Sequence, residues 1–199
     1  MSAPQYADAS VRNSAPILGV LRDELKDCRR LLEIGTGTGH HAVTFAAALP
    51  AISWQTSDLE ESHMWIKSSI DAAGISNVLP PLIVDVRDTT LPGESYDAVY
   101  SANTAHIMSF AAVQKMFPLI GHVLENYGLF CYYGPFKRNG QFSTPSNAGF
   151  DASLRSRDAN MGIRDLETLD ELAVSAKLQR QRVYAMPANN LLVVWQKTN

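Results

Sequence analysis

The chain has 199 residues, of which 46% are hydrophobic and 19% charged, a composition typical of one globular domain over residues 1–199. Its net charge of −3, with no basic run, favours a small-molecule partner and argues against nucleic acid. The N-terminus has no basic start or apolar core, and no apolar run approaches about 18 residues, so we expect no signal peptide and no membrane partner.

Helix and strand patterns alternate along the first half of the chain. Apolar residues recur with helical spacing over 15–25, Ser14 is the expected N-cap, and Pro16 falls in the first turn of a helical N-terminal segment that covers about 1–28. The next patterns predict a strand over 29–35, a helix over 40–49, a strand over 52–58 and a helix over 60–74 that Gly74 closes.

The alternation continues in the second half. Strands are predicted over 79–86, with its prolines at the entry, over 95–103 and over 128–136, and a helix is predicted over 111–124. A lid-like insertion of polar residues follows over about 134–164. A helix over 165–178 and two strands joined by "MPANN" end the sequence.

This alternation, with nearly continuous apolar strands, predicts an α/β fold. We expect a Rossmann-like, doubly wound, seven-stranded and mostly parallel sheet, in which the C-terminal hairpin sets one antiparallel strand at the edge. In such folds ligands bind in a crevice at the carboxyl ends of the central strands.

Three glycines in "LLEIGTGTGHHAV" lie between the first central strand and the next helix. Gly35 allows the turn, Gly37 lets the backbone approach a ligand, and Gly39 lets the helix start close to the strand. A tight turn without a ligand is the alternative. His40 stands where a dinucleotide fingerprint requires glycine, and the chain has no Gly-Lys pair of a Walker loop.

Carboxylates accompany the glycine loop. Glu33 lies just before it, and Asp58 ends the second strand, where it can accept both ribose hydroxyls of an adenosine or cap the next helix. Asp85 ends the third strand, where it can meet the adenine edge or instead be a turn residue or a partner for Arg87.

The glycine loop and these three acids resemble the motifs of class I S-adenosylmethionine-dependent methyltransferases. The resemblance implies S-adenosyl-L-methionine (SAM) as cofactor, S-adenosyl-L-homocysteine (SAH) as product, and the class I methyltransferase fold. It places the loop under the methionine part of the cofactor, the second-strand acid at the ribose and the third-strand acid near adenine. The implied cofactor residues are Glu33, Gly35, Thr36, Gly37, Gly39, His40, Asp58, Leu59, Asp85 and Val86.

Longer blocks resemble a small methyltransferase-like family long described as uncharacterised, with bacterial members and a mammalian relative. They include "LEIGTGTGHHAVTFA", "NTAHI", "YGPFKRNGQF", "SNAGFDASLRSRD" and "GIRDLE", and with Arg12-Asn13 they span residues 12 to 190. The resemblance implies that Arg12 and Asn13 close over the cofactor. It implies no particular substrate.

Candidate catalytic residues follow the fourth and fifth strands. Asn103 is expected to contact the methionine part of SAM, and His106, with a side-chain pKa near neutrality, is the candidate base or orienter of the substrate. His106 could instead cap a short helix or pack under the lid. Strand alternation turns either Tyr132 or Tyr133 toward the cleft, and Tyr133 is the second catalytic candidate.

The polar insertion is expected to grip the substrate through Asn147, Phe150 and Arg155, because long ordered loops often carry function. A lid held only by its own salt bridges is the alternative.

The sequence therefore predicts a SAM-dependent methyltransferase that acts on a small molecule, as a monomer or homodimer. The alternatives are a non-catalytic SAM-binding regulatory or scaffold protein and, less favoured because of His40, a nucleotide-dependent oxidoreductase. Cys28 and Cys131 are isolated and no histidine pair has metal-ligand spacing, so we expect a cytoplasmic protein without a metal.

Overall fold

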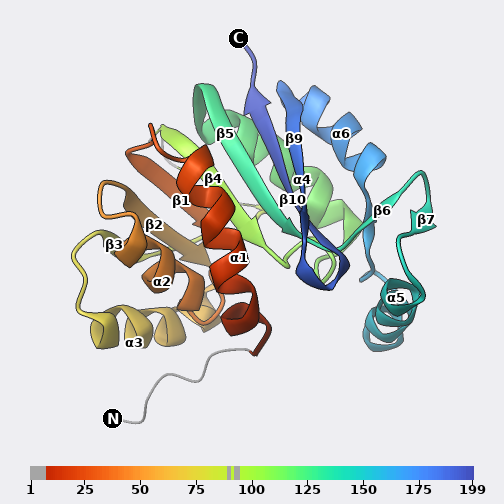
Figure 1. Cartoon of the computed structure of the whole chain (residues 1–199), viewed down its shortest axis with the longest axis horizontal. Coiled ribbons are helices and arrows are strands. Elements are labelled where there is room, and N and C mark those ends of the chain that lie inside the picture. The colour runs from red at the N-terminus through yellow and green to blue at the C-terminus, as the bar shows by residue number, and fades with distance from the viewer. Residues whose placement is uncertain (1–7, 89–90, 92–94) are drawn as a thin grey trace.

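Strands and helices alternate and end in an antiparallel hairpin (Figure 1). The structure, a computed structural model, describes residues 8–88, 91 and 95–199. The strands are β1 (Arg30–Ile34), β2 (Ser53–Asp58), β3 (Val78–Ile83), β4 (Tyr96–Ala102), β5 (Leu124–Gly134), β6 (Phe136–Arg138), β7 (Gln141–Phe142), β8 (Arg164–Asp165), β9 (Leu178–Met186) and β10 (Asn190–Lys197). The helices are α1 (Asp8–Glu24), α2 (His40–Ala48), α3 (His63–Ala73), α4 (Phe110–Val123), α5 (Pro145–Arg157) and α6 (Leu166–Ser175), with short 3-10 helices η1 (Glu60–Ser62) and η2 (Pro187–Asn189).

The main sheet has seven strands in the order β3-β2-β1-β4-β5-β10-β9. The first five are parallel, and β10 runs antiparallel to both of its neighbours. The predicted fold class is confirmed, but the antiparallel strand lies one place in from the edge. The reason is composition: the centre of β10 is apolar and buried, whereas β9 is polar and largely exposed, which suits an edge strand.

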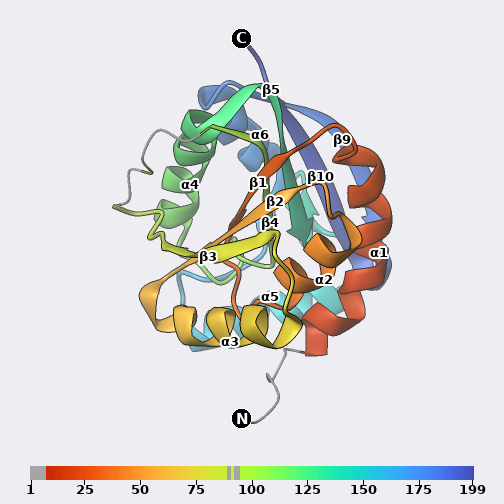
Figure 2. The same cartoon turned by 90° about the vertical axis from the view of Figure 1, so that its left-hand side faces the viewer.

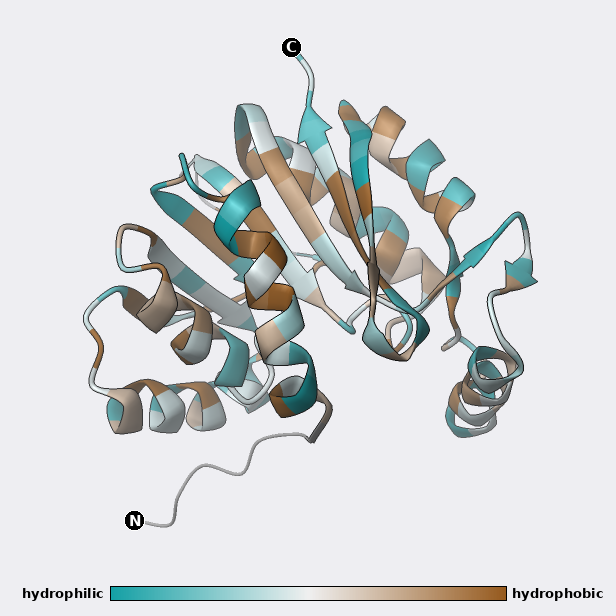
Figure 3. Cartoon of the chain, in the orientation of Figure 1, coloured by the Kyte–Doolittle hydropathy of each residue, from teal (hydrophilic) through white to brown (hydrophobic). Residues whose placement is uncertain are grey.

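Helices cover both faces of this sheet (Figure 2). Because successive strand residues point to opposite faces, Leu32 and Phe130 pack under α4 and α6, while Leu31 and Cys131 pack under α1 and α2. Figure 3 shows hydrophobic residues along the central strands, between these layers. Among the described helices, none has the length and apolar character needed to cross a membrane.

The first helix extends further toward the N-terminus than the sequence predicts. It already includes Asp8, so Ser14 is an interior residue whose Oγ donates to the carbonyl of Ser10 (2.7 Å), and Pro16 lies inside the helix. The prediction of Ser14 as N-cap is therefore wrong, because the polar residues before it continue the helix. Residues 1–7 of the predicted N-terminal segment lie outside the described residues.

The third strand differs from its prediction in two ways. Pro80 and Pro81 lie in the middle of β3 rather than at its entry, which is tolerated because β3 is an edge of the sheet. The strand also ends at Ile83, so Asp85 lies in the segment that follows it.

The predicted lid is more ordered than a loop. It forms a small sheet in the order β7-β6-β8 and the helix α5, which lies apart from the main layers at one end of the molecule (Figure 1). Thr144 caps α5 by accepting from the amide of Asn147 (3.3 Å), and Pro145 opens the first turn.

Candidate functional site

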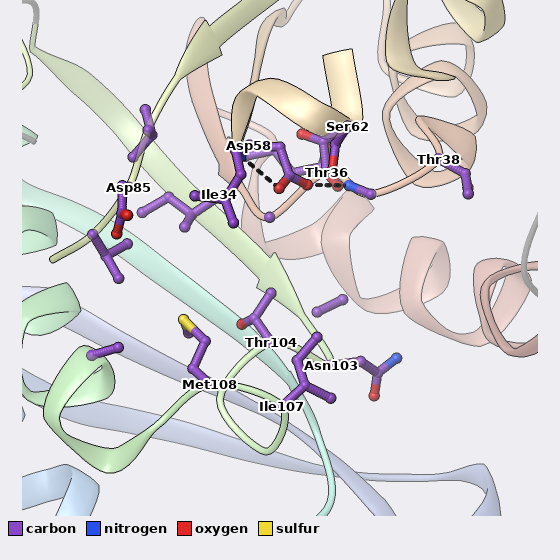
Figure 4. Close-up of a pocket in the computed structure, with 18 of the residues that line it drawn as sticks. Ile34, Thr36, Thr38, Asp58, Ser62, Asp85, Asn103, Thr104, Ile107 and Met108 are labelled. Atoms are coloured by element: carbon purple, nitrogen blue, oxygen red, sulfur yellow. Dashed lines mark hydrogen bonds between the residues drawn. The ribbon is translucent and has the colours of Figure 1, made fainter. Parts of the chain in front are cut away.

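A cavity of about 620 Å³ opens at the carboxyl ends of β1, β2 and β4 (Figure 4). Asp58, Thr36 and Ser62 lie on one side of it, and Thr104, Ile107 and Met108 on the other. The residues predicted from the sequence that line this cavity are Glu33, Gly35, Thr36, Gly37, His40, Asp58, Leu59, Asp85, Val86 and Asn103.

The three glycines of the loop all have left-handed φ angles, +73° at Gly35, +64° at Gly37 and +85° at Gly39. A Cβ on Gly39 would stand 2.9 Å from Cβ of Ser69, so this glycine brings α2 close to α3, not to the strand as predicted. A Cβ on Gly37 would meet nothing within 4 Å, so this part of the backbone is open toward a ligand.

Asp58 fastens the glycine loop to the end of β2. Its Oδ2 accepts from the amide of Gly37 (2.6 Å), and its Oδ1 accepts from the amide of Leu59 (2.7 Å). The next helix, η1, has Leu59 as its N-cap and no side-chain cap, so Asp58 does not serve as its N-cap. An ionised carboxylate has about four lone-pair sites, so both oxygens can still accept from a ligand.

Glu33 lies beneath the loop and is fully buried among its partners. The indole Nε1 of Trp54 donates to its Oε2 (2.9 Å), and Thr36 also hydrogen-bonds its carboxyl group. Burial raises the pKa of Glu33 to about 8, against the opposing effect of these hydrogen bonds. Glu33 is therefore mostly protonated at neutral pH and adds little charge to the cavity.

Asp85 pairs with Arg87, as one interpretation of the sequence has it. The Arg87 Nε lies 2.9 Å from Oδ1 of Asp85, and Nη2 lies 2.5 Å from Oδ2. The hydrogen bonds from Arg87 lower the pKa of Asp85 to about 2. Both residues line the cavity, so its third acid is already neutralised by a cation.

A buried row of hydroxyl groups positions the segment after β4. Ser101 Oγ donates to the carbonyl of Ile34 (2.8 Å), so Thr104 Oγ1 donates to Ser101 (2.8 Å) and the Tyr132 hydroxyl donates to Thr104 (3.2 Å). The same Tyr132 oxygen accepts from the amide of Ala105. These contacts fix the turn that carries Thr104, Ile107 and Met108, which sequence reasoning missed as cavity residues. The only signal in the sequence is that the turn follows a central strand.

Neither predicted catalytic residue lines the cavity. His106 is buried one residue before Ile107, and its ring meets that of Phe150 edge-on, with 5.3 Å between centroids. Burial, and then the charges of Arg164 and Arg157, lower the pKa of His106 to about 4.

Tyr133 points into the layer under α1 and α2. Its hydroxyl accepts from Nδ2 of Asn190 (2.9 Å), and burial raises its pKa. Its neighbour Asn103 has a left-handed φ of +59° and does line the cavity, with its amide donating to the carbonyl of Tyr133 (2.9 Å).

Arg12 and Asn13 lie on α1 outside the cavity wall, where Arg12 is exposed and Asn13 half-buried. Ser10, closer to the start of the same helix, lines the cavity instead. The sequence offers no signal for this residue, because its placement depends on the unpredicted first turns of α1.

The lid residues mainly contact one another. Asn147 Nδ2 donates to Ser143 Oγ (2.9 Å), and Arg155 Nε pairs with Asp151 Oδ2 (2.8 Å), which matches the interpretation of a salt-bridged lid. Asp158, just after α5, is the lid residue that lines the cavity. Over the described ranges, no group of three or more His, Cys, Asp or Glu could hold a metal ion.

Solved methyltransferases share this fold. An O-methyltransferase family protein from Burkholderia thailandensis matches 96% of this chain with a TM-score of 0.84 at 15% identity. PigF with SAH matches 94% with a TM-score of 0.80 at 17% identity, and human N-acetylserotonin methyltransferase in complex with SAM matches 96% with a TM-score of 0.78 at 15% identity. This chain spans 58%, 56% and 53% of those three chains, respectively.

This chain thus has the fold that these solved methyltransferases share. The chain belongs to the family described as "Protein of unknown function (DUF938)", whose profile matches residues 4–197.

Proposed function

We propose that this protein is a SAM-dependent methyltransferase that acts on a small-molecule acceptor. The observation that carries the proposal is the cavity at the glycine loop, where an open left-handed glycine and the Asp58 carboxylate face the same space. Its volume of about 620 Å³ is within the range of roughly 300–1,000 Å³ found for small-molecule sites. The shared fold of solved methyltransferases supports the same proposal.

The residues present fit this cofactor. Gly37 offers bare backbone, Asp58 has free lone pairs for ribose hydroxyls, and Leu59 and Val86 offer apolar surface to a flat base. Glu33 stays mostly uncharged. The bound cofactor supplies a methyl group on positively charged sulfur, and the protein aligns the acceptor and excludes water.

His106 is the proposed base that removes a proton from the acceptor. The imidazole is uncharged at neutral pH and has a ring nitrogen that can accept a proton, but its lowered pKa of about 4 makes it a weaker base than an ordinary histidine. His106 does not line the cavity although the next residue, Ile107, does, so this role requires the acceptor to reach beyond the cavity wall. Replacing His106 with Gln is expected to abolish turnover while SAM still binds, and unchanged turnover would exclude the role.

Calorimetric titration with SAM, SAH and NAD tests the cofactor. We expect SAM and SAH to bind and NAD to fail. Asp58→Asn removes the negative charge and one acceptor oxygen, so it should weaken the binding of both SAM and SAH by about tenfold or more. Asp71→Asn, a matched change at an exposed position of α3, should leave both affinities unchanged. Tighter binding of NAD than of SAM, or wild-type affinities for SAM and SAH in the Asp58→Asn variant, would refute the proposal.

A SAM-binding protein without catalysis is the second candidate, because neither His106 nor Tyr133 lines the cavity. Incubating the protein with methyl-labelled SAM and a small-molecule extract separates the two. A labelled product that needs His106 supports the enzyme. Tight SAM binding with no labelled product across extracts supports the regulatory or scaffold role.

A further inference from the structure

Arg164 is a buried cation that forms no ion pair with a carboxylate within the part of the chain that the structure describes. Its side chain is 9% exposed, and its hydrogen bonds all go to carbonyl oxygens. Nε donates to Ala105 (2.9 Å), and Nη2 donates to Met108 and to Asn160 (2.8 Å). The ring of Phe110 lies against the guanidinium, 5.8 Å from Cζ to centroid.

The second terminal nitrogen of Arg164, Nη1, is left over. None of the described residues accepts a hydrogen bond from its two N–H donors, and it is not among the buried polar atoms without a partner, so it reaches solvent. A buried guanidinium without an ion-pair partner is costly, and a neutral amide could donate to some of the same carbonyls. The retained charge and the free donors therefore point to an anionic ligand.

The surroundings of Arg164 favour an anion. Arg157 forms no ion pair with a described residue, and its charge acts, as that of Arg164 does, on His106. Arg155 also faces Arg164, but Asp151 neutralises it through an ion pair of 2.8 Å. The charge of Asp151 also favours the charged form of Arg164, although its ion pair is with Arg155. Tyr132 acts on Arg164 as well, and its raised pKa of about 12 keeps it uncharged.

Arg164 is also placed beside the cavity. Ala105 and Met108, whose carbonyls it holds, bracket the turn that presents Ile107 and Met108 to the cavity. Figure 4 shows this turn on the side of the cavity opposite Asp58. A group bound at Arg164 would thus belong to a molecule that approaches the cavity from the lid side.

We propose that Arg164, assisted by Arg157, binds a carboxylate of the methyl acceptor, so that the substrate is a small organic acid. This inference rests on the proposed function, since it names the substrate class of the same site. A singly charged carboxylate fits better than a phosphate dianion, because Asp158 adds a negative charge to the cavity wall next to Arg157.

Binding of two molecules of the same shape tests this subsite. With SAH present at saturation, benzoate and its uncharged amide, benzamide, are titrated by calorimetry, and inorganic phosphate is a third probe. We expect benzoate to bind at least about tenfold more tightly than benzamide, as for a charge-assisted contact. Benzoate should also raise the pKa of His106, followed by NMR, because it places a negative charge near the ring.

Three variants locate the site. Arg164→Gln and Arg157→Gln should each weaken benzoate binding several-fold, whereas Arg22→Gln, a matched change at an exposed position of α1, should not. Arg157 is exposed and holds no described partner, so its variant keeps the test valid even if Arg164→Gln fails to fold. If the Arg164 guanidinium only holds the turn, the Arg157→Gln variant should bind benzoate with wild-type affinity.

The outcomes separate this inference from the proposed function. Suppose that the protein binds SAH but does not bind benzoate detectably, binds benzoate and benzamide equally well, or binds phosphate more tightly than benzoate. Any of these results overturns the carboxylate subsite and leaves the methyltransferase proposal standing. Benzoate selectivity that depends on Arg157, in a protein that binds neither SAM nor SAH, supports the subsite and overturns the proposed function.

Discussion

Replacing Gly39 with alanine should destabilise the protein by about 2–5 kcal/mol. The left-handed φ of +85° costs an alanine about 1–2 kcal/mol. The new Cβ would also lie 2.9 Å from Cβ of Ser69 and 3.4 Å from Cα of Ile66, and crowding of this kind adds about 1–3 kcal/mol. Because α2 and α3 meet here, the same change should disturb the glycine loop and weaken SAH binding.

Urea unfolding measures this free energy, and Gly74→Ala provides the control. Gly74 has a left-handed φ of +62°, but its Cβ would meet nothing within 4 Å, so only the conformational cost of about 1–2 kcal/mol remains. In a double-mutant cycle, Ser69→Gly should recover part of the loss in the Gly39→Ala background. Equal losses in the two alanine variants, or no coupling with Ser69, would refute the claim that Gly39 sets the distance between α2 and α3.

Three further predictions concern titration and the lid. Burial raises the pKa of Glu33 from 4.5 to about 8, so between these pH values the folded chain holds a proton that the unfolded chain has lost. The free energy of unfolding should therefore fall as pH rises through this range. In urea titrations between pH 5 and 9, Glu33→Gln should flatten this dependence on pH, and an unchanged slope would count against the buried carboxyl. Arg164→Gln should raise the pKa of His106 above about 4 in an NMR titration, because Arg164 lowers that pKa more than Arg157 does. A constant pKa would contradict this. Asp151→Asn loses the ion pair to Arg155 and weakens the hydrogen bond from the Ile163 amide (2.7 Å). Limited proteolysis within α5 should therefore be faster in this variant than in the wild type or in the control variant Asp71→Asn. Equal rates would show that the Asp151 carboxylate does not hold the lid.

Local patterns in the sequence were sufficient to predict the sheet and the glycine loop. Apolar strands that end at glycine or aspartate specify both the parallel layers and the edge at which Gly37 and Asp58 meet, because carboxyl ends of parallel strands share one edge. These features depend on residues close together in sequence or on the rule that relates adjacent strands.

The opposite cavity wall could not be predicted in the same way. The turn that carries Ile107 is fixed by Ser101, Thr104 and Tyr132. Tyr132 contacts Thr104 and Ala105, which are 28 and 27 positions away from it in the sequence, and no local pattern connects residues so far apart. The predicted catalytic role of Tyr133 assumed that a strand-end tyrosine reaches the cleft, but both tyrosines are buried within the layers.

The helix α5 was missed for a different reason. Its buried positions include Asn147 and Asp151 as well as Leu154, so the segment lacks the apolar periodicity that marks an amphipathic helix. Polar contacts to Ser143 and Arg155 replace hydrophobic packing on that face. Such contacts depend on the folded arrangement and leave no periodic signal in the sequence.

Mapping backbone amide shifts during an SAH titration tests the central claim most directly. The account predicts that the amides of Gly37 and Leu59 shift most, because both donate to the Asp58 carboxylate at the cavity. Shifts confined to the second cavity, around Asp27 and Gly128 at the other end of the strands, would contradict the account, as would the absence of any shift at saturating SAH.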